Sequence, residues 1–161
     1  MARQIQITLE KRGVTCTAEL LDDLAPKTCQ AFWNALPQGG DAYHAKYANN
    51  EVYTLVPPFA DEEPGLENPT MMPTSGDLLY FFFSGTQISQ SAFNEKSGAS
   101  DAVDLAIFYG RDNYLLSPTL GPVPGNRFGT ITENFEAMAK ACDNIWREGF
   151  KGERLVFNRK E

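Results

Sequence analysis

The chain has 161 residues, 42% of them hydrophobic and 22% charged, which is typical of one globular domain with a sizeable core. Its formal net charge of −7 disfavours nucleic acids and anionic membranes as partners, because both depend on contacts from Lys and Arg. Three cysteines without the spacing of a metal site, and a start without a secretory signal, predict a cytoplasmic protein with reduced thiols, no metal and no cofactor.

The first part of the chain predicts a hairpin followed by a helix. Apolar and polar residues alternate over 3–10 and 14–21, as in half-buried strands, and Gly13 lies in the turn between them. Pro26 favours the first turn of a helix. We expect Pro37 and the glycine pair at 39–40 to end this helix, whose apolar stripe is Cys29, Phe32, Trp33 and Leu36.

The remainder predicts more strands and a second helix. The expected strands are 41–47, 51–56, 78–83, 104–109, 127–131 and 155–157. Two polar segments, 57–76 and 84–102, predict long surface loops, and 115–126 predicts a rigid irregular segment. Thr132 is the expected N-cap of the second helix, which ends near Gly149 and turns inward Phe135, Met138, Ala139, Cys142, Ile145 and Trp146. This pattern predicts a single domain, 1–161, that is mainly β and forms an antiparallel barrel or sandwich with two helices.

Two resemblances narrow this architecture. The segment Pro26-Lys27-Thr28, with Phe32 after it, resembles the first helix of cyclophilins. Nearly the whole chain is similar to a family of small bacterial cyclophilin-like domains of unknown function, through residues 51–57, 75–81, 106–111 and 115–126 and the late helix. The second resemblance implies a closed, largely antiparallel eight-stranded barrel capped by two α-helices.

The resemblance does not extend to the prolyl isomerase site. Cyclophilins carry a Phe-His-Arg motif whose arginine supports the twisted prolyl amide, and this chain has Tyr43-His44-Ala45-Lys46 instead. A lysine does not reproduce the planar fork of a guanidinium group. We therefore transfer no catalytic residue, and peptidyl-prolyl isomerisation is the alternative rather than the leading function.

His44 is the only histidine, and strand alternation predicts that it projects on the same side as Lys46. If Glu51 or Tyr53 on the next strand lies opposite, a base, a cation and an acid converge. A surface ion pair of little energetic value is an equally frequent result of such spacing.

A second group of candidates follows the strand at 104–109. Arg111 and Asn113 could bind a carboxylate or an amide, although a turn that caps its own backbone has at least equal weight. Ser117 lies in a loop dense in proline and glycine. A Ser-His-Asp triad using Ser117 or Ser84 is disfavoured because the sequence has no Gly-x-Ser-x-Gly elbow.

These observations predict a protein that binds a small polar or anionic ligand at a barrel mouth. The candidate ligand-binding residues are His44, Lys46, Glu51, Tyr53, Tyr80, Arg111, Asn113 and Ser117. The sequence leaves open whether the protein is an enzyme and whether it forms a homo-oligomer. A non-catalytic interaction module, using the 57–76 loop or exposed aromatics, also stays open.

Overall fold

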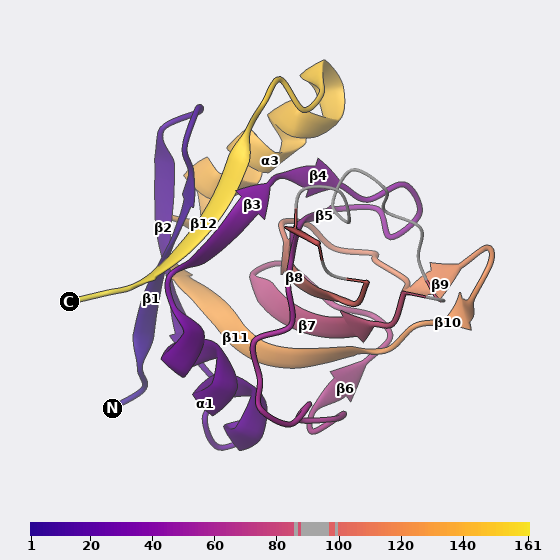
Figure 1. Ribbon diagram of the computed structural model, residues 1–161. Coiled ribbons are helices and arrows are strands. Elements are labelled where there is room, and N and C mark those ends of the chain that lie inside the picture. The colour runs from indigo at the N-terminus through magenta and orange to yellow at the C-terminus, as the bar shows by residue number, and fades with distance from the viewer. Residues whose placement is uncertain (86, 88–96, 99) are drawn as a thin grey trace.

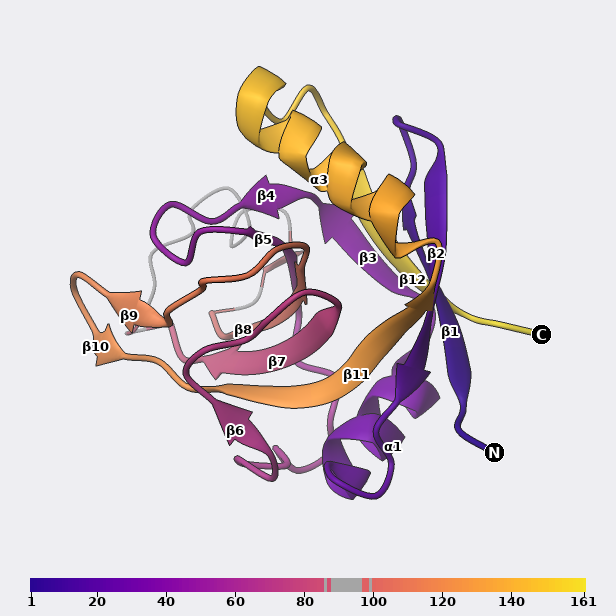
Figure 2. The ribbon, with the colours of Figure 1, turned by 180° about the vertical axis from the view of Figure 1, so that it is seen from behind.

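The computed structural model describes residues 1–85, 87, 97–98 and 100–161, and it is built on one ten-stranded sheet (Figure 1). The sheet has the order β3-β12-β1-β2-β11-β7-β8-β5-β4, with β6 paired to β11. Its strands are β1 (Gln4–Leu9), β2 (Val14–Leu20), β3 (Gln38–Asp41), β4 (Tyr43–His44), β5 (Glu51–Val56), β6 (Pro69–Thr70), β7 (Asp77–Phe83), β8 (Ala102–Phe108), β11 (Gly125–Glu133) and β12 (Arg154–Arg159). A separate small hairpin consists of β9 (Leu116–Ser117) and β10 (Gly121–Pro122). The helices are α1 (Pro26–Ala35) and α3 (Phe135–Glu148). In Figure 2, α3 lies above the curled sheet and α1 lies below it.

The mainly β, antiparallel architecture with two helices is confirmed, but the closed eight-stranded barrel is wrong. The sheet has ten strands, and no ladder of hydrogen bonds between described residues joins its end strands, β3 and β4. These strands are separated in the chain only by Ala42. The backbone of β3 packs on β5 without pairing, since a Cβ atom on Gly40 would lie 2.7 Å from Oγ1 of Thr54. The glycine pair therefore belongs to a closely packed strand and does not end α1, which already ends at Ala35.

α1 lies over an aromatic cluster centred on Phe32, which is fully buried. The ring of Phe32 makes edge contacts with Phe128 of β11 and Phe157 of β12, at centroid distances of 5.0 and 5.7 Å. Such edge-to-face pairs add stabilisation beyond the buried area. The strand-to-helix segment therefore fixes the core of the scaffold.

α3 begins later than predicted. Strand β11 continues to Glu133, so Thr132 is a strand residue and Asn134, in the left-handed conformation at φ 60°, precedes the helix. The helix buries Met138, Ala141, Cys142 and Ile145. Trp146 was expected in the core but is 61% exposed. No helix in the described ranges is long and apolar enough to cross a membrane.

The three segments predicted to be loops or irregular compare differently with the structure. Segment 57–76 holds only the short strand β6, as expected of a loop. Much of the 84–102 loop prediction falls on residues 86, 88–96 and 99, which lie outside the described residues. Segment 115–126 is more regular than predicted, because it contains the β9–β10 hairpin.

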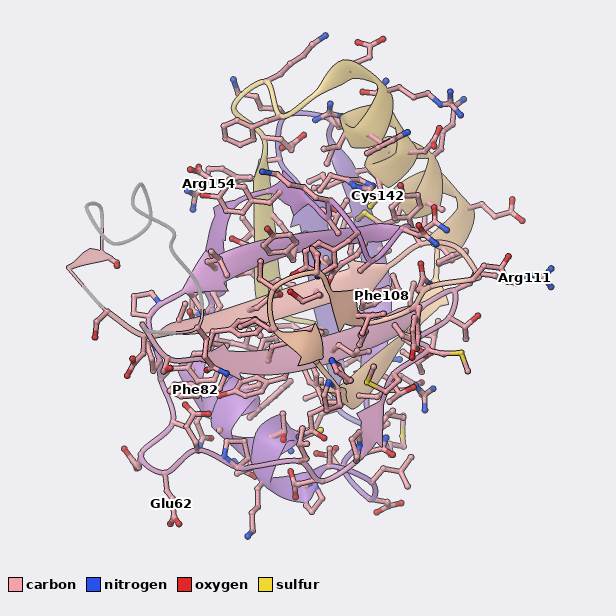
Figure 3. All side chains as sticks on the ribbon, turned by 90° about the vertical axis from the view of Figure 1, so that its right-hand side faces the viewer. Glu62, Phe82, Phe108, Arg111, Cys142 and Arg154 are labelled. Atoms are coloured by element: carbon pink, nitrogen blue, oxygen red, sulfur yellow. The ribbon has the colours of Figure 1, made fainter. Side chains whose placement is uncertain are left out.

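The central strands β5, β7 and β8 are buried on both faces. Their inner face packs into the main core, which both helices complete. Their outer face carries a second apolar cluster beneath the β9–β10 hairpin, formed by Leu79, Phe81, Ala106, Phe108 and Leu115 with Ala45 and Ala48. Figure 3 looks onto this side of the molecule, with Phe108 near the centre and Arg111 at the edge.

Candidate functional site

A cavity of about 160 Å³ lies on the outer face of β5, β7 and β8. Strand alternation places Glu51, Tyr53 and Leu55 of β5 on this face, and Asp104 of β8 joins them. The apolar walls come from Leu55, Phe81, Phe83, Leu115 and Val123. Ala106 pairs with Tyr53, so an alanine and a tyrosine lie between the positions of Glu51 and Asp104 on this face.

The cavity contains two buried carboxyl groups. Glu51 is 6% exposed and Asp104 is 7% exposed. Neither side chain has a hydrogen bond or ion pair with any residue in the described part of the chain, and Oδ1 of Asp104 is buried without a partner. A buried acid without a partner is energetically costly. The pair is therefore the most unusual polar feature of this face.

The environment of the pair favours the neutral acids. Burial raises the pKa of Glu51 to about 8. Burial also raises the pKa of Asp104, and the charge of Glu51 raises it further. The nearby Tyr53 hydroxyl also has a raised pKa, first through burial and then through the two carboxylates. At neutral pH, Glu51 is consequently poised between a hydrogen-bond donor and an anion.

A lysine lies at the mouth of the cavity. The backbone N–H of Ala45 donates to the carbonyl oxygen of Glu51 at 3.0 Å, and Lys46 follows directly. The Lys46 side chain is exposed and borders both the cavity and a neighbouring groove. No carboxylate of a described residue lies within ion-pair distance of its ammonium group.

A trough of about 400 Å³ adjoins the cavity and shares Phe81, Phe83 and Val123 with its lining. The rings of Phe81 and Phe83 are stacked at a centroid distance of 5.7 Å. On the far side, the Tyr80 hydroxyl donates to Oε2 of Glu63, while Oε1 of Glu63 is buried without a partner in the described chain. The predicted candidate Tyr80 therefore belongs to the trough rather than to the cavity with Glu51.

His44 lies in a different groove, of about 410 Å³, that also includes Lys46 and Arg111. The register pairs Val52 with His44 and Tyr53 with Tyr43, so His44 points away from Glu51 and Tyr53. Its Nδ1 atom lies 2.8 Å from the Ala45 carbonyl oxygen and must donate to it.

The other ring nitrogen of His44 consequently accepts a hydrogen bond from a tyrosine hydroxyl. Nε2 lies 2.6 Å from the Tyr109 hydroxyl, which donates to it. Burial lowers the pKa of His44 despite the bond to Ala45. The exposed ring of Trp146 lies beside the imidazole, at a centroid distance of 5.1 Å. Hydrogen bonds at both ring nitrogens thus hold the neutral imidazole of His44 in place. Neither nitrogen is left to accept a further proton without losing one of these bonds.

The last two candidates hold loops together. Asn113 is buried and donates to the carbonyl oxygens of Pro73 and Gly110, each at 2.8 Å. The hydroxyl of Ser117 accepts the backbone N–H of Leu120 at 3.1 Å within the β9–β10 hairpin. The alternative interpretation of these residues as backbone-capping turns accounts for their contacts.

The residue that the sequence reasoning missed is Asp104. Its signal was a single acid at the start of an otherwise apolar strand that is buried on both faces. Within the described ranges, no group of three or more His, Cys, Asp or Glu side chains could hold a metal ion. The structure therefore brings together Lys46, Glu51, Tyr53 and Asp104 around one cavity. Of these four, only Lys46 also lines the groove of His44, and none lines the trough of Tyr80.

Comparison with known proteins gives a family and a fold. The family model described as a protein of unknown function, DUF3830, matches residues 7–157. No curated protein sequence matches the chain.

Solved structures resemble it at low identity. The structure of McbB in complex with tryptophan has a TM-score of 0.66 and 20% identity over 97% of this chain and 44% of McbB, so the chain spans less than half of that protein. A hypothetical protein from Archaeoglobus fulgidus has a TM-score of 0.53 and 19% identity over 99% of this chain and 95% of its own. The Mimivirus cyclophilin has a TM-score of 0.51 and 12% identity over 98% of this chain and 87% of its own. These similarities establish a cyclophilin-like fold.

Proposed function

The chain belongs to DUF3830, a protein family of unknown function, and we propose that its acidic cavity binds a small organic amine with an apolar body. The observation that carries this proposal is the pair Glu51 and Asp104, which are buried, face a cavity and have no partner in the described chain. An ammonium group placed between them would supply the missing ion pair and hydrogen bonds.

The walls of the cavity support an apolar body on the ligand. Leu55, Phe81 and Leu115 offer aliphatic and aromatic surface around the acids. The cavity volume of about 160 Å³ is close to the roughly 150 Å³ of an engineered cavity that binds benzene. A six-membered ring therefore fits the cavity, and a longer ligand can extend into the trough beyond Phe81.

The buried acids change the predicted chemistry of the ligand. The sequence alone predicts a polar or anionic ligand. An anion would pair only with Lys46 and would keep both acids protonated, whereas a cation can pair with the ionised form of either acid. A ligand with at least one cationic group suits Glu51 and Asp104 better.

Prolyl isomerisation is not favoured. No arginine is found among the described residues that line the cavity or the trough. The nearest candidate, Arg111, belongs to the groove of His44. The guanidinium group that supports a twisted prolyl amide in cyclophilins therefore has no counterpart beside the aromatic pocket.

A second candidate function is proton transfer to or from the bound ligand. It is favoured by the pKa of Glu51, which burial raises to about 8 and so brings close to neutral pH. Proton NMR of each bound ligand in D₂O tests this function. Catalysis predicts conversion or hydrogen–deuterium exchange with the wild-type protein and none with Glu51→Gln. An unchanged ligand in both samples would restrict the function to binding.

Calorimetric titration with 2-phenylethylamine at pH 7 tests the binding function. We expect Glu51→Gln and Asp104→Asn each to weaken binding by about ten- to a hundredfold, because each removes a charged hydrogen-bond partner of the ammonium group. Glu136→Gln removes one negative charge from the exposed start of α3 and is the matched control. Equal affinity in all four proteins would contradict the proposal.

Related ligands extend this titration. Benzylamine and isopentylamine test a shorter linker and an aliphatic body. Tryptophan, which the McbB structure contains, and tryptamine test a larger ring system in the trough. Failure of every amine to bind would overturn the proposed function.

A further inference from the structure

We propose that the amine ligand also carries a carboxylate that Lys46 binds at the mouth of the cavity, so that the preferred ligand is a zwitterion of the α-amino acid type. This inference rests on the proposed amine site. It adds a second, oppositely charged contact and therefore a defined substrate class.

The first support is the position of Lys46. Its neighbour Ala45, directly after β4, donates its backbone N–H to the carbonyl oxygen of Glu51 at 3.0 Å, so Lys46 follows a residue that is bound to one of the two acids. Lys46 also borders the cavity that contains both acids. A cation and the acid pair thus belong to one cavity and differ in depth, because Lys46 is exposed and the acids are buried.

The second support is the absence of an internal partner. Lys46 forms no ion pair within 4.0 Å with either Glu51 or Asp104, nor with any other acid in the described chain. By contrast, the nearby Asp143 of the adjoining groove already pairs with Arg147 at 2.7 Å. Within the described chain, the cavity therefore has a cation at its mouth and two acids inside it that lack ion-pair partners, and a zwitterion would pair with both at the same time.

The depth of the charges sets the orientation of the ligand. The ammonium group would be held by Glu51 and Asp104 in the buried part of the cavity. The carboxylate would remain at the solvent-exposed mouth with Lys46, where a charged group loses less hydration. The side chain of the amino acid would lie against the apolar walls and extend toward Phe81.

The energetic expectation follows from exposure. An exposed ion pair contributes little, so the carboxylate contact should improve affinity by about three- to fivefold, whereas the buried acids should contribute most of the affinity. The amine is therefore the required group and the carboxylate selects among amines.

Three ligands with the same ring separate the two contacts: 2-phenylethylamine, 3-phenylpropanoate and L-phenylalanine. For the wild-type protein at pH 7 we expect L-phenylalanine to bind about three- to fivefold more tightly than the amine, and 3-phenylpropanoate to bind most weakly. The pairs benzylamine with phenylglycine and isopentylamine with leucine repeat the comparison for smaller and aliphatic bodies.

The variant Lys46→Met tests the contact itself. It should abolish the preference for the amino acid while leaving the affinity for the amine equal or slightly higher, because one cation is removed. Lys140→Met, an exposed position on α3 with the same change in charge, should keep the wild-type preference. An amine that binds at least as tightly as its amino acid, or a preference that survives Lys46→Met, would overturn the inference and leave the amine site intact. Failure of amines and amino acids alike would overturn both.

Discussion

Two regions of this protein bury acidic side chains, and they differ in whether those side chains have hydrogen-bond and ion-pair partners. Glu153, directly before β12, is fully buried and accepts hydrogen bonds from the backbone N–H groups of Lys11 and Arg12 at 2.7 and 2.9 Å. The guanidinium group of Arg12 pairs with it at 3.1 Å. Glu51 and Asp104 are almost as buried but have no such partner in the described chain.

The difference shows that partners, rather than burial, determine the charge state of an internal acid. Burial alone would raise the pKa of Glu153, but the backbone hydrogen bonds from Lys11, Arg154 and Arg12 and the side-chain hydrogen bond from Arg12 hold it below its usual value. Burial is the first cause of the raised pKa values of Glu51 and Asp104. Glu153 ties the first hairpin to the last strand, and the unpartnered pair faces a cavity.

The largest expected change in stability follows from replacing Glu153, the acid that has partners. Glu153→Ala should lower the free energy of unfolding at pH 7 by about 3–5 kcal/mol, because the guanidinium group of Arg12 and several backbone donors lose their acceptor. Urea unfolding measures this change. Glu10→Ala, which removes an exposed ion pair with Arg154, is the control and should change stability by about 1 kcal/mol or less. Equal losses of stability from the two substitutions would show that the partners of Glu153 contribute no more than an exposed ion pair.

Replacing an acid of the unpartnered pair should raise the free energy of unfolding, whereas replacing Glu153 lowers it. Below about pH 4.3, the ordinary pKa of a glutamic acid, Glu51 is mostly protonated in the folded and the unfolded protein, so its burial then costs little ionisation. As the pH rises from there to about 8, the unfolded chain releases protons that folded Glu51 retains, and stability falls. Glu51→Gln should therefore raise the free energy of unfolding at pH 8 by on the order of a few kcal/mol, and have little effect at pH 4.5.

Urea unfolding at both pH values measures this difference. The free energy of unfolding of Glu153→Gln should be lower than that of the wild-type protein at pH 8, although the chemical change is identical. A wild-type stability that rises steadily between pH 5 and 8, with no gain from Glu51→Gln, would show that the pair is ionised and partnered in solution.

A smaller effect is expected on the pKa of Asp104, and it tests whether the charge of Glu51 acts on Asp104. The charge of Glu51 contributes to the raised pKa of Asp104, so Glu51→Gln should lower that pKa. Titration of the carboxyl carbon resonance of Asp104 by NMR measures it. An unchanged pKa would mean that the two groups do not share the cavity.

The smallest effect concerns an acid at the surface. Asp143 pairs with Arg147 at 2.7 Å on the exposed side of α3. Asp143→Asn should change the free energy of unfolding by about 0.5 kcal/mol or less, because solvent screens the pair. Thermal unfolding measures this change, and a loss comparable to that of Glu153→Ala would show that exposure does not rank these acids.

The scaffold follows from local pattern to a large extent. Strand alternation predicted β1, β2 and β5 to within a residue or two, and Pro26 marked the start of α1. The arrangement of the sheet ends did not follow, because it depends on the close packing of Gly40 against Thr54, residues remote in sequence. Local residue preferences carry no information about that contact.

The site could be predicted only in part. Lys46, Glu51 and Tyr53 were among the candidates and do share the cavity. His44 was expected to join them, but β4 consists of only Tyr43 and His44, and its register turns the imidazole to the other face. Asp104 became visible as a partner only when β8 was placed beside β5.

Proton release on ligand binding tests the central claim most directly. Calorimetric titration of 2-phenylethylamine in buffers of different ionisation enthalpy at pH 7 measures it. Because Glu51 is largely protonated at this pH and must ionise to pair with an ammonium group, the wild-type protein should release close to one proton per ligand bound. Glu51→Gln with Asp104→Asn should release none and bind far more weakly. Binding of the amine to the wild-type protein without proton release, and with the same affinity in the double variant, would contradict the account.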